Sequence, residues 1–205
     1  LQIVAIDLEH PTRDFTKEPA MNETEFLNAV KDGLASVPND ADLLCVGEMG
    51  IGNTTSAAAL CLSLFGGEAT DWTGPGTGVT GGTYQLKVNA VADAVRLQAP
   101  YITNGIEALQ HLGGRELAAI AGAIIGARIN RIPVVLDGFV AGAAASALKC
   151  TQREALNHCI AGHVSAEPGH QLLLKELAMP PLLNLSMRLG EASGATLAIS
   201  IIKAA

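Results

Sequence analysis

The sequence predicts an α/β fold in which helices flank a mostly parallel β-sheet. Short continuous apolar runs, which are typical of buried parallel strands, alternate along the chain with helical patterns. Apolar residues make up 49% of the chain and charged residues only 16%, a balance that argues against disorder. The 205 residues suffice for one domain with a sizeable core.

The first part of the chain is expected to hold two strands and two helices. An apolar run over residues 1–6 predicts a strand. Asn22, followed three residues later by Glu25, matches a capping box, so a helix should begin there. Residues 43–46 form a second apolar run, and the glycine-rich loop after it should lead into a helix that starts near Thr54.

The remainder of the chain continues this alternation. Residues 70–82 are rich in glycine and are expected to form a loop. We expect strands over residues 133–136 and 156–161, and helices over residues 84–97, 107–112, 115–127, 140–148 and 193–203. Ligands of open α/β sheets bind at the carboxyl ends of strands, which points to the loops after Val46, at Asp137 and after Ala161.

Composition and charge restrict the class of partner. The formal net charge is −7 and no basic stripe is visible, so we do not expect nucleic acid as a partner. The longest apolar stretch, residues 118–127, is too short to span a bilayer. No cysteine pair has C-x-x-C spacing, and we expect reduced, mostly buried thiols in a cytoplasmic protein. The cysteines are Cys45, Cys61, Cys150 and Cys159.

The first candidate site is the loop GEMGIGNTT at residues 47–55. Its glycines let the backbone approach a ligand closely, and the amino end of the following helix favours a phosphate or carboxylate. The alternative is a tight strand-to-helix turn without a ligand. Glu48 would repel a phosphate, so this side chain is better suited to a ribose hydroxyl or an N–H group.

Three further segments could contact a ligand. Lys87, near the glycine-rich residues 74–78, could pair with a phosphate or could be a solvated surface lysine. Asp137 could accept from ribose hydroxyls or could N-cap the next helix. Ser165, within residues 162–170, could donate to a phosphate. For the two histidines of that loop, ordinary hydrogen bonding is favoured over metal binding.

Glu191 lies in the segment RLGEASGA at residues 188–195, directly before an apolar helix. We expect its carboxylate to be buried there, and burial would raise its pKa toward the value that a general base needs near neutral pH. The alternative is that Glu191 is a first-turn residue stabilised by the helix dipole.

Together these segments resemble the nicotinate-nucleotide:dimethylbenzimidazole phosphoribosyltransferase family of cobalamin lower-ligand assembly. The resemblance covers essentially the whole chain. The matching runs are TRDF (12–15), EPAM (18–21), GEMGIGNTT (47–55), GTG (76–78), VVLDGF (134–139), SAEPGH (165–170) and RLGEASGA (188–195). It implies a Rossmann-like sheet with a small helical appendage, and a cytoplasmic homodimer. It also implies one nucleotide-binding catalytic domain over residues 1–205, without an upstream segment that the family has.

The resemblance implies a reaction as well. Ribose 5-phosphate would move from nicotinate mononucleotide to dimethylbenzimidazole, giving α-ribazole phosphate and nicotinate, with no metal or other cofactor. Glu191 would be the catalytic base, Asp137 would hold the ribose and Ser165 the phosphate. The full set of substrate-binding residues would be Glu48, Met49, Gly50, Gly52, Lys87, Asp137, Gly138, Ser165 and Leu189.

Two departures from the family pattern affect this interpretation. Many members carry an arginine where this chain has Pro75 and Val164. Two alternatives stay open: a nucleotide-binding module without turnover, because the upstream segment supplies much of the family's pocket for the base, and a related transferase with a different acceptor base.

Overall fold

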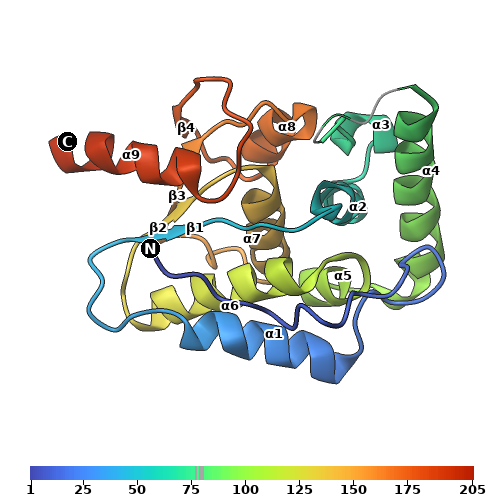
Figure 1. Ribbon diagram of the computed structural model, residues 1–205, viewed down its shortest axis with the longest axis horizontal. Helices are drawn as coiled ribbons and strands as arrows, with labels where there is room; N and C mark the ends of the chain where they lie inside the picture. Colours follow the sequence, from blue (N-terminus) through green and yellow to red (C-terminus); the bar gives the residue numbers. More distant parts are fainter. Residues whose placement is uncertain (77, 79–80) are drawn as a thin grey trace.

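Helices cover both faces of a four-stranded parallel sheet (Figure 1). The structure, a computed structural model, describes residues 1–76, 78 and 81–205. Across the sheet the strands are β1 (Leu44–Val46), β2 (Val134–Leu136), β3 (Cys159–His163) and β4 (Pro181–Leu183), each parallel to its neighbour. The predicted α/β class with a parallel sheet is confirmed.

The α-helices and one short 3₁₀ helix make up most of the rest of the described chain. They are α1 (Glu23–Ala35), α2 (Asn53–Phe65), α3 (Ala69–Trp72), α4 (Gly81–Gln98), η1 (Ala99–Tyr101), α5 (Gly105–Leu112), α6 (Arg115–Ile129), α7 (Phe139–Thr151), α8 (Pro168–Glu176) and α9 (Ser193–Ala204).

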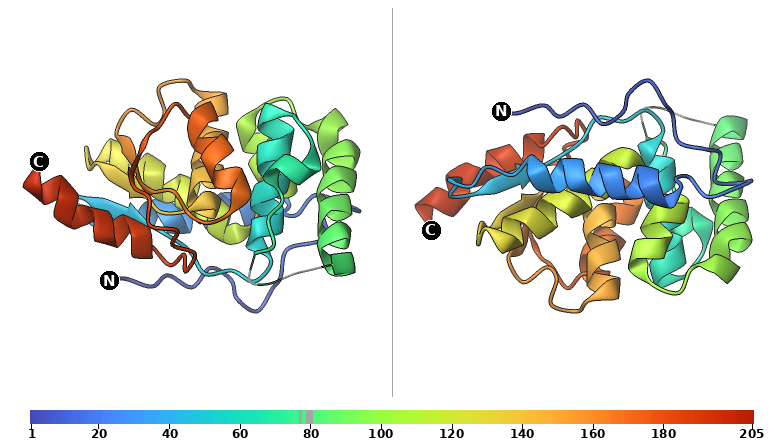
Figure 2. Two further views of the ribbon diagram at one scale, coloured as in Figure 1. Left: turned by 90° about the horizontal axis from the view of Figure 1, so that it is seen from above. Right: turned by 90° about the horizontal axis from the view of Figure 1, so that it is seen from below.

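The central strand β2 shows how the sheet separates two apolar clusters. Val134 and Leu136 belong to the main core, together with residues of α6 and α7. Val135 points to the opposite face, because side chains alternate along a strand, and packs with Ala195 and Ala198 of α9. In the views from above and below, α9 and α6 lie on opposite sides of the strands (Figure 2).

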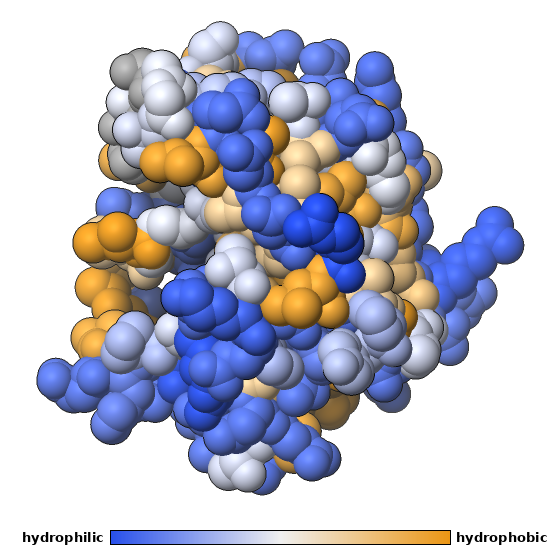
Figure 3. Space-filling view, turned by 90° about the vertical axis from the view of Figure 1, so that its right-hand side faces the viewer, coloured by the Kyte–Doolittle hydropathy of each residue, from blue (hydrophilic) through white to orange (hydrophobic). Residues whose placement is uncertain are grey.

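A helical appendage lies beside the sheet. Helix α2 packs against α3, α4 and α5, and α4 forms the edge of the molecule farthest from the strands (Figure 1). Viewed from that edge, hydrophobic side chains are interspersed with hydrophilic ones (Figure 3). Among the described residues, none of the helices combines the length and apolar character that a membrane crossing requires.

Small residues allow the outer helix α1 to approach α6 closely. A Cβ on Gly122 would lie 2.0 Å from the backbone oxygen of Val30, and one on Gly33 would lie 1.8 Å from that of Ala119. Side chains at either glycine would force the helices apart, since a buried interface has no free volume to absorb them. This packing explains how a chain with 3% aromatic residues builds a core.

Several sequence expectations are confirmed, two are wrong, and one strand was missed. Asn22 and Glu25 form both hydrogen bonds of the capping box that begins α1. Residues 1–6 are not a strand but an extended, largely exposed segment, because no described strand pairs with them. The expected loop at residues 70–82 contains part of α3, and the short strand β4 was not expected. Three residues of that loop region lie outside the described residues: Thr77, Val79 and Thr80.

The thiols are also less uniformly buried than expected. Cys61 and Cys159 are buried, whereas Cys45 is half-buried and Cys150 is exposed. All are free cysteines.

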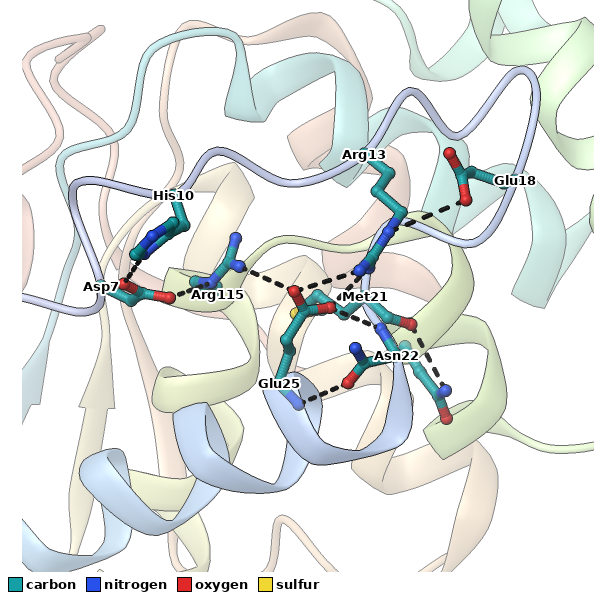
Figure 4. Close-up of polar contacts among 9 residues, drawn as sticks. Asp7, His10, Arg13, Glu18, Met21, Asn22, Glu25 and Arg115 are labelled. Carbon is teal, nitrogen blue, oxygen red and sulfur yellow. Dashed lines mark hydrogen bonds and ion pairs between the residues drawn. The ribbon is translucent and has the colours of Figure 1, made fainter.

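An ion-pair network ties the amino-terminal segment to α1 and α6 (Figure 4). Glu25 accepts from Arg13 Nη1 at 2.5 Å and lies 3.4 Å from Arg115 Nη2, and Arg115 Nε lies 3.4 Å from an oxygen of Asp7. The hydrogen bond from Arg13 and a second from the backbone of Asn22 lower the pKa of Glu25. We call Asp7, Arg13, Glu25 and Arg115 the anchor cluster.

Candidate functional site

The loops that follow the four strands meet at one edge of the sheet, because parallel strands end on the same side. A Cβ on Gly47, after β1, would lie 2.0 Å from the backbone nitrogen of Ala192, in the turn before α9. A Cβ on Gly138, after β2, would lie 3.7 Å from the Cβ of Ser165, after β3. The segments that the sequence singled out are therefore neighbours, and we call this region the carboxyl-edge site.

Four helices begin at the carboxyl-edge site. The N-cap residues of α2, α7, α8 and α9 are Gly52, Gly138, Glu167 and Ala192, and none of them makes a side-chain hydrogen bond to its helix. Free N–H groups at the amino end of a helix, together with the helix dipole, attract anions. The arrangement therefore suits a phosphorylated ligand.

Glu48 is the carboxyl group whose surroundings shift its pKa most clearly at this site. Its Oε2 accepts from Nδ2 of Asn53 in the first turn of α2. Burial is the main cause that raises the pKa of Glu48 to about 7, and the negative charges of Glu116, Asp137 and Glu191 add to it. The hydrogen bond from Asn53 lowers this pKa and only partly offsets the rise. Near neutral pH this carboxyl group is protonated about half of the time.

Glu191 is exposed, so the expectation that it is buried is wrong. It lies in a turn of left-handed residues, with φ of 78° at Gly190, 59° at Glu191 and 60° at Ala192. This turn precedes Ser193, where the helix begins, and holds Glu191 away from the apolar face of α9. The turn nevertheless lies against the Glu48 loop, since a Cβ on Gly190 would be 3.6 Å from Oε1 of Glu48.

Asp137 connects the end of β2 to α9 through a hydrogen bond. It is 2% exposed, and its Oδ1 accepts from the backbone N–H of Ala195 at 2.9 Å and lies 3.4 Å from Nε2 of His163. The alternative that Asp137 caps the next helix is wrong, because Gly138 is the N-cap of α7. The bond to Ala195 instead fixes the first turn of α9 and, with it, the turn that carries Glu191. The expected contact with ribose stays a prediction.

Ser165 is held in place by a buried histidine. Nδ1 of His170 accepts from the backbone N–H of Ser165 at 2.8 Å and lies 2.9 Å from Oγ of the same residue. Burial lowers the pKa of His170 to about 3, so the ring stays neutral and its Nδ1 can remain an acceptor. The hydrogen-bonding role favoured for this histidine is confirmed.

Lys87 reaches from α4 to the amino end of α2. Its Nζ donates to Oγ1 of Thr54 at 2.9 Å and to the backbone oxygen of Gly74 at 2.8 Å. Burial lowers the pKa of Lys87, while the charge of Glu167 opposes that effect. The alternative of a solvated surface lysine is therefore wrong, and pairing with a phosphate stays a prediction.

The remaining predicted contacts differ in their surroundings. Gly52 has φ of 84°, a left-handed conformation that favours glycine. Met49 and Leu189 are 77% and 68% exposed, so their apolar side chains are accessible from solvent. For all three, contact with a substrate stays a prediction.

Sequence reasoning missed polar groups that the fold brings to this edge. Asn53 and Glu116 were not singled out, because each was taken only as part of a helix start. Within the described part of the chain, buried side-chain nitrogen and oxygen atoms without a hydrogen-bond partner belong to Thr73, His163, Glu167 and Ser193. All four lie in or beside the loops of the carboxyl-edge site. The sequence signal for Glu116 was its place in the first turn after the Gly113–Gly114 break that precedes α6.

Comparisons with known proteins agree with this geometry. The phosphoribosyltransferase family model matches residues 1–205. Proteins of Brucella anthropi and Brucella canis, each named nicotinate-nucleotide–dimethylbenzimidazole phosphoribosyltransferase, are 54% identical over all 205 residues, which span 60% of their length. The crystal structure of CobT from Thermus thermophilus superposes with a TM-score of 0.89 at 38% identity, covering 94% of this chain and 59% of CobT.

The chain thus spans about three fifths of the length of these relatives, and the match extends over its entire sequence. The resemblance inferred from seven short motifs is confirmed by these comparisons. The chain belongs to the nicotinate-nucleotide:dimethylbenzimidazole phosphoribosyltransferase family.

Proposed function

We propose that this protein transfers ribose 5-phosphate from nicotinate mononucleotide to dimethylbenzimidazole, giving α-ribazole phosphate and nicotinate. Family membership supports the proposal, but the observation that carries it is the geometry of the carboxyl-edge site. Four helix amino ends, whose N-cap residues make no side-chain hydrogen bond to their helices, meet two carboxyl groups, Glu48 and Glu191, on adjoining loops. Such a site suits an anionic nucleotide whose reacting carbon needs an acid–base group.

The nucleotide would bind with its phosphate at the 164–167 loop. Ser165 would hydrogen-bond the phosphate, and the free N–H groups at the start of α7 and α8 would share its negative charge. Lys87 of α4, whose Nζ reaches the start of α2, would approach the nucleotide as a cation. The ribose would lie near Asp137, between the phosphate loop and the turn of Glu191.

The transfer requires one proton acceptor and a good leaving group. The Glu191 carboxylate would take the proton from one ring nitrogen of the base while the other ring nitrogen attacks the anomeric carbon. The bond between that carbon and nicotinate would break, and its electron pair would neutralise the pyridinium nitrogen. Inversion converts the β-linked donor into an α-linked product. Base assistance of this kind accelerates a reaction by roughly 10²- to 10⁴-fold.

The exposure of Glu191 is compatible with this role. A base that arrives from solvent can reach an exposed carboxylate, whereas Glu48 is more enclosed and would face the nucleotide. The two carboxyl groups would therefore act on different partners. Glu191 would face the acceptor, and Glu48 would contact the ribose or the nicotinate ring.

The direct test is to incubate the protein with nicotinate mononucleotide, with and without dimethylbenzimidazole, and to measure nicotinate and α-ribazole phosphate by chromatography. We expect both products only when the base is present. Nucleotide binding without nicotinate release would instead favour a binding module. Release with adenine, another benzimidazole or a phenol, but not with dimethylbenzimidazole, would favour a transferase with a different acceptor.

The same family resemblance leads us to propose a homodimer that works in the cytoplasm. Light scattering coupled to size-exclusion chromatography would test the oligomeric state. A monomeric mass over the working concentration range would contradict the proposed dimer.

A further inference from the structure

Glu116 lies beside the glycine-rich loop, with its side chain next to Gly50. It is the second residue of α6, and its Oε1 lies 2.8 Å from the point where a Cβ on Gly50 would stand. Nδ2 of Asn53 lies 2.9 Å from the same point. The absence of a side chain at Gly50 therefore leaves room for the Glu116 carboxyl and the Asn53 amide to approach each other.

The Asn53 amide connects two carboxyl groups on different elements. Its Nδ2 donates to Oε2 of Glu48, and the same amide favours the charged form of Glu116. An asparagine side chain carries two N–H donors, so one amide can serve both partners. Asn53 thus lies between Glu48, in the loop after β1, and Glu116, at the amino end of α6.

The charges around this pair are unevenly distributed. Glu48 is faced by Glu116 from α6, Asp137 from the end of β2 and Glu191 from the turn before α9, all negative. Burial raises the pKa of Glu116 as well, but its own backbone N–H, the Asn53 amide and the charge of Arg115 all oppose that effect, whereas Asn53 alone does so for Glu48. When one of the two carboxyl groups must carry a proton, Glu48 is therefore the better candidate.

We propose that Glu116 is a positioning residue for the transfer reaction: from the amino end of α6 it lies beside the Asn53 amide and, through that amide, fixes the Glu48 carboxyl. A protonated Glu48 can donate a hydrogen bond to an anionic acceptor such as a carboxylate, which an ionised Glu48 cannot do. This inference rests on the proposed function, because it assumes that the Glu48 carboxyl faces the nucleotide.

The test is a direct titration of Glu48 in the full chain, without substrates. Protein labelled with ¹³C at the glutamate carboxyl carbon is titrated by NMR, and the Glu48 signal is assigned by its loss in Glu48→Gln. In Glu116→Gln we expect the pKa of Glu48 to fall by about one unit, a tenfold change in proton affinity. In the matched control Glu23→Gln, an exposed residue of α1, it should not move. An unchanged pKa in Glu116→Gln would overturn the proposal.

A second variant changes the same pKa in the opposite direction. Asn53→Ala removes the donor that stabilises ionised Glu48, so the pKa of Glu48 should rise further. This measurement still tests the proposal if Glu116→Gln does not fold. An unchanged or lowered pKa of Glu48 in Asn53→Ala would contradict the proposed role of the Asn53 amide.

Activity supplies an independent readout. If the wild-type protein catalyses the transfer, the alkaline limb of its pH profile should move to lower pH in Glu116→Gln, in parallel with the pKa of Glu48, while Glu23→Gln keeps the wild-type profile. A uniform loss of activity with an unmoved profile would mean that Glu116 is merely structural. Absence of transfer by the wild type would refute the proposed function. The titration would still show whether Glu116 changes the pKa of Glu48.

Discussion

The anchor cluster and the carboxyl-edge site both gather acidic side chains, but different neighbours surround them. In the anchor cluster, Glu25 faces the cations Arg13 and Arg115, and its pKa is lowered (Figure 4). At the carboxyl-edge site, Glu48 faces three other carboxyl groups and one amide, and its pKa is raised to about 7. The same residue type is thus held charged in one place and kept close to half-protonated in the other.

The difference indicates what each cluster is for. The groups of the anchor cluster bind one another, so the cluster is complete within this chain. At the carboxyl-edge site, buried atoms of Thr73, His163, Glu167 and Ser193 lack partners, and each such atom costs about 1–3 kcal/mol. Unpaired polar atoms beside free helix amino ends are what a site for a polar ligand requires. The first cluster stabilises the fold, and the second is suited to a substrate.

The largest expected effect comes from removing the charge of Glu191. Glu191→Gln should retain nucleotide binding and lose roughly 10²- to 10⁴-fold in kcat, because a glutamine cannot accept the proton of the base. Steady-state kinetics together with calorimetric titration of nicotinate mononucleotide would measure both quantities. The control is Glu176→Gln, an exposed glutamate of α8. Unchanged turnover in Glu191→Gln would reject the assigned base.

A smaller effect is expected at the 164–167 loop, where we propose that the phosphate binds. Ser165→Ala removes one hydrogen bond to a charged group, worth about 1.5–3 kcal/mol, so the Kd for nicotinate mononucleotide should rise about 10- to 100-fold. Ser200→Ala, on the exposed side of α9, should leave the Kd unchanged. Equal affinities of the two variants would place the phosphate elsewhere.

The helix interface that supports the anchor cluster can be tested through its glycines. In Gly122→Ala the new methyl group would meet the backbone oxygen of Val30, so we expect a loss of about 1–3 kcal/mol in the free energy of unfolding. Gly82→Ala is the matched control in α4, where a Cβ meets no atom of the described residues within 4 Å. That variant should gain up to about 1 kcal/mol from helix propensity. Urea denaturation would show whether the two changes have opposite signs.

The smallest expected effect is that of the Glu25 charge. Glu25→Gln keeps a capping-box acceptor but removes the ion pairs, so it should cost about 1 kcal/mol or less at pH 7. Because the pKa of Glu25 is lowered in the folded protein, this contribution is present above its unfolded pKa of about 4.3 and disappears as the pH falls through the folded value.

Denaturation at a series of pH values would follow the difference in stability between wild type and Glu25→Gln. The difference should shrink toward acid pH. A difference that grew on acidification would contradict the lowered pKa of Glu25. Glu23→Gln, which changes a neighbouring exposed charge, controls for the helix dipole.

Much of the fold follows from local sequence signals. The capping box at Asn22 and the apolar runs that became β1 and β2 were predictable because the signal is contained in a few neighbouring residues. The strand predicted over residues 1–6 was wrong, because an apolar run forms a strand only if another strand pairs with it. Strand β4 went unnoticed for the opposite reason, since two prolines at its start indicate a break.

The site was predictable as a set of motifs but not as an electrostatic environment. Sequence order placed Glu191 beside an apolar helix, yet the left-handed turn at residues 190–192 exposes it. The raised pKa belongs instead to Glu48, through burial and through charges contributed by α6, β2 and the turn before α9. Such a sum depends on contacts between residues far apart in the chain, which no local pattern reveals.

The most direct test of the account is a crystal structure of the protein with nicotinate mononucleotide bound. We predict the phosphate within about 3 Å of Ser165 Oγ, the ribose near Asp137, and the Glu191 carboxyl facing the anomeric carbon across a gap large enough for a base. A nucleotide bound elsewhere, such as in the groove beside Arg96 and Tyr101, with no density at the carboxyl-edge site, would contradict the account.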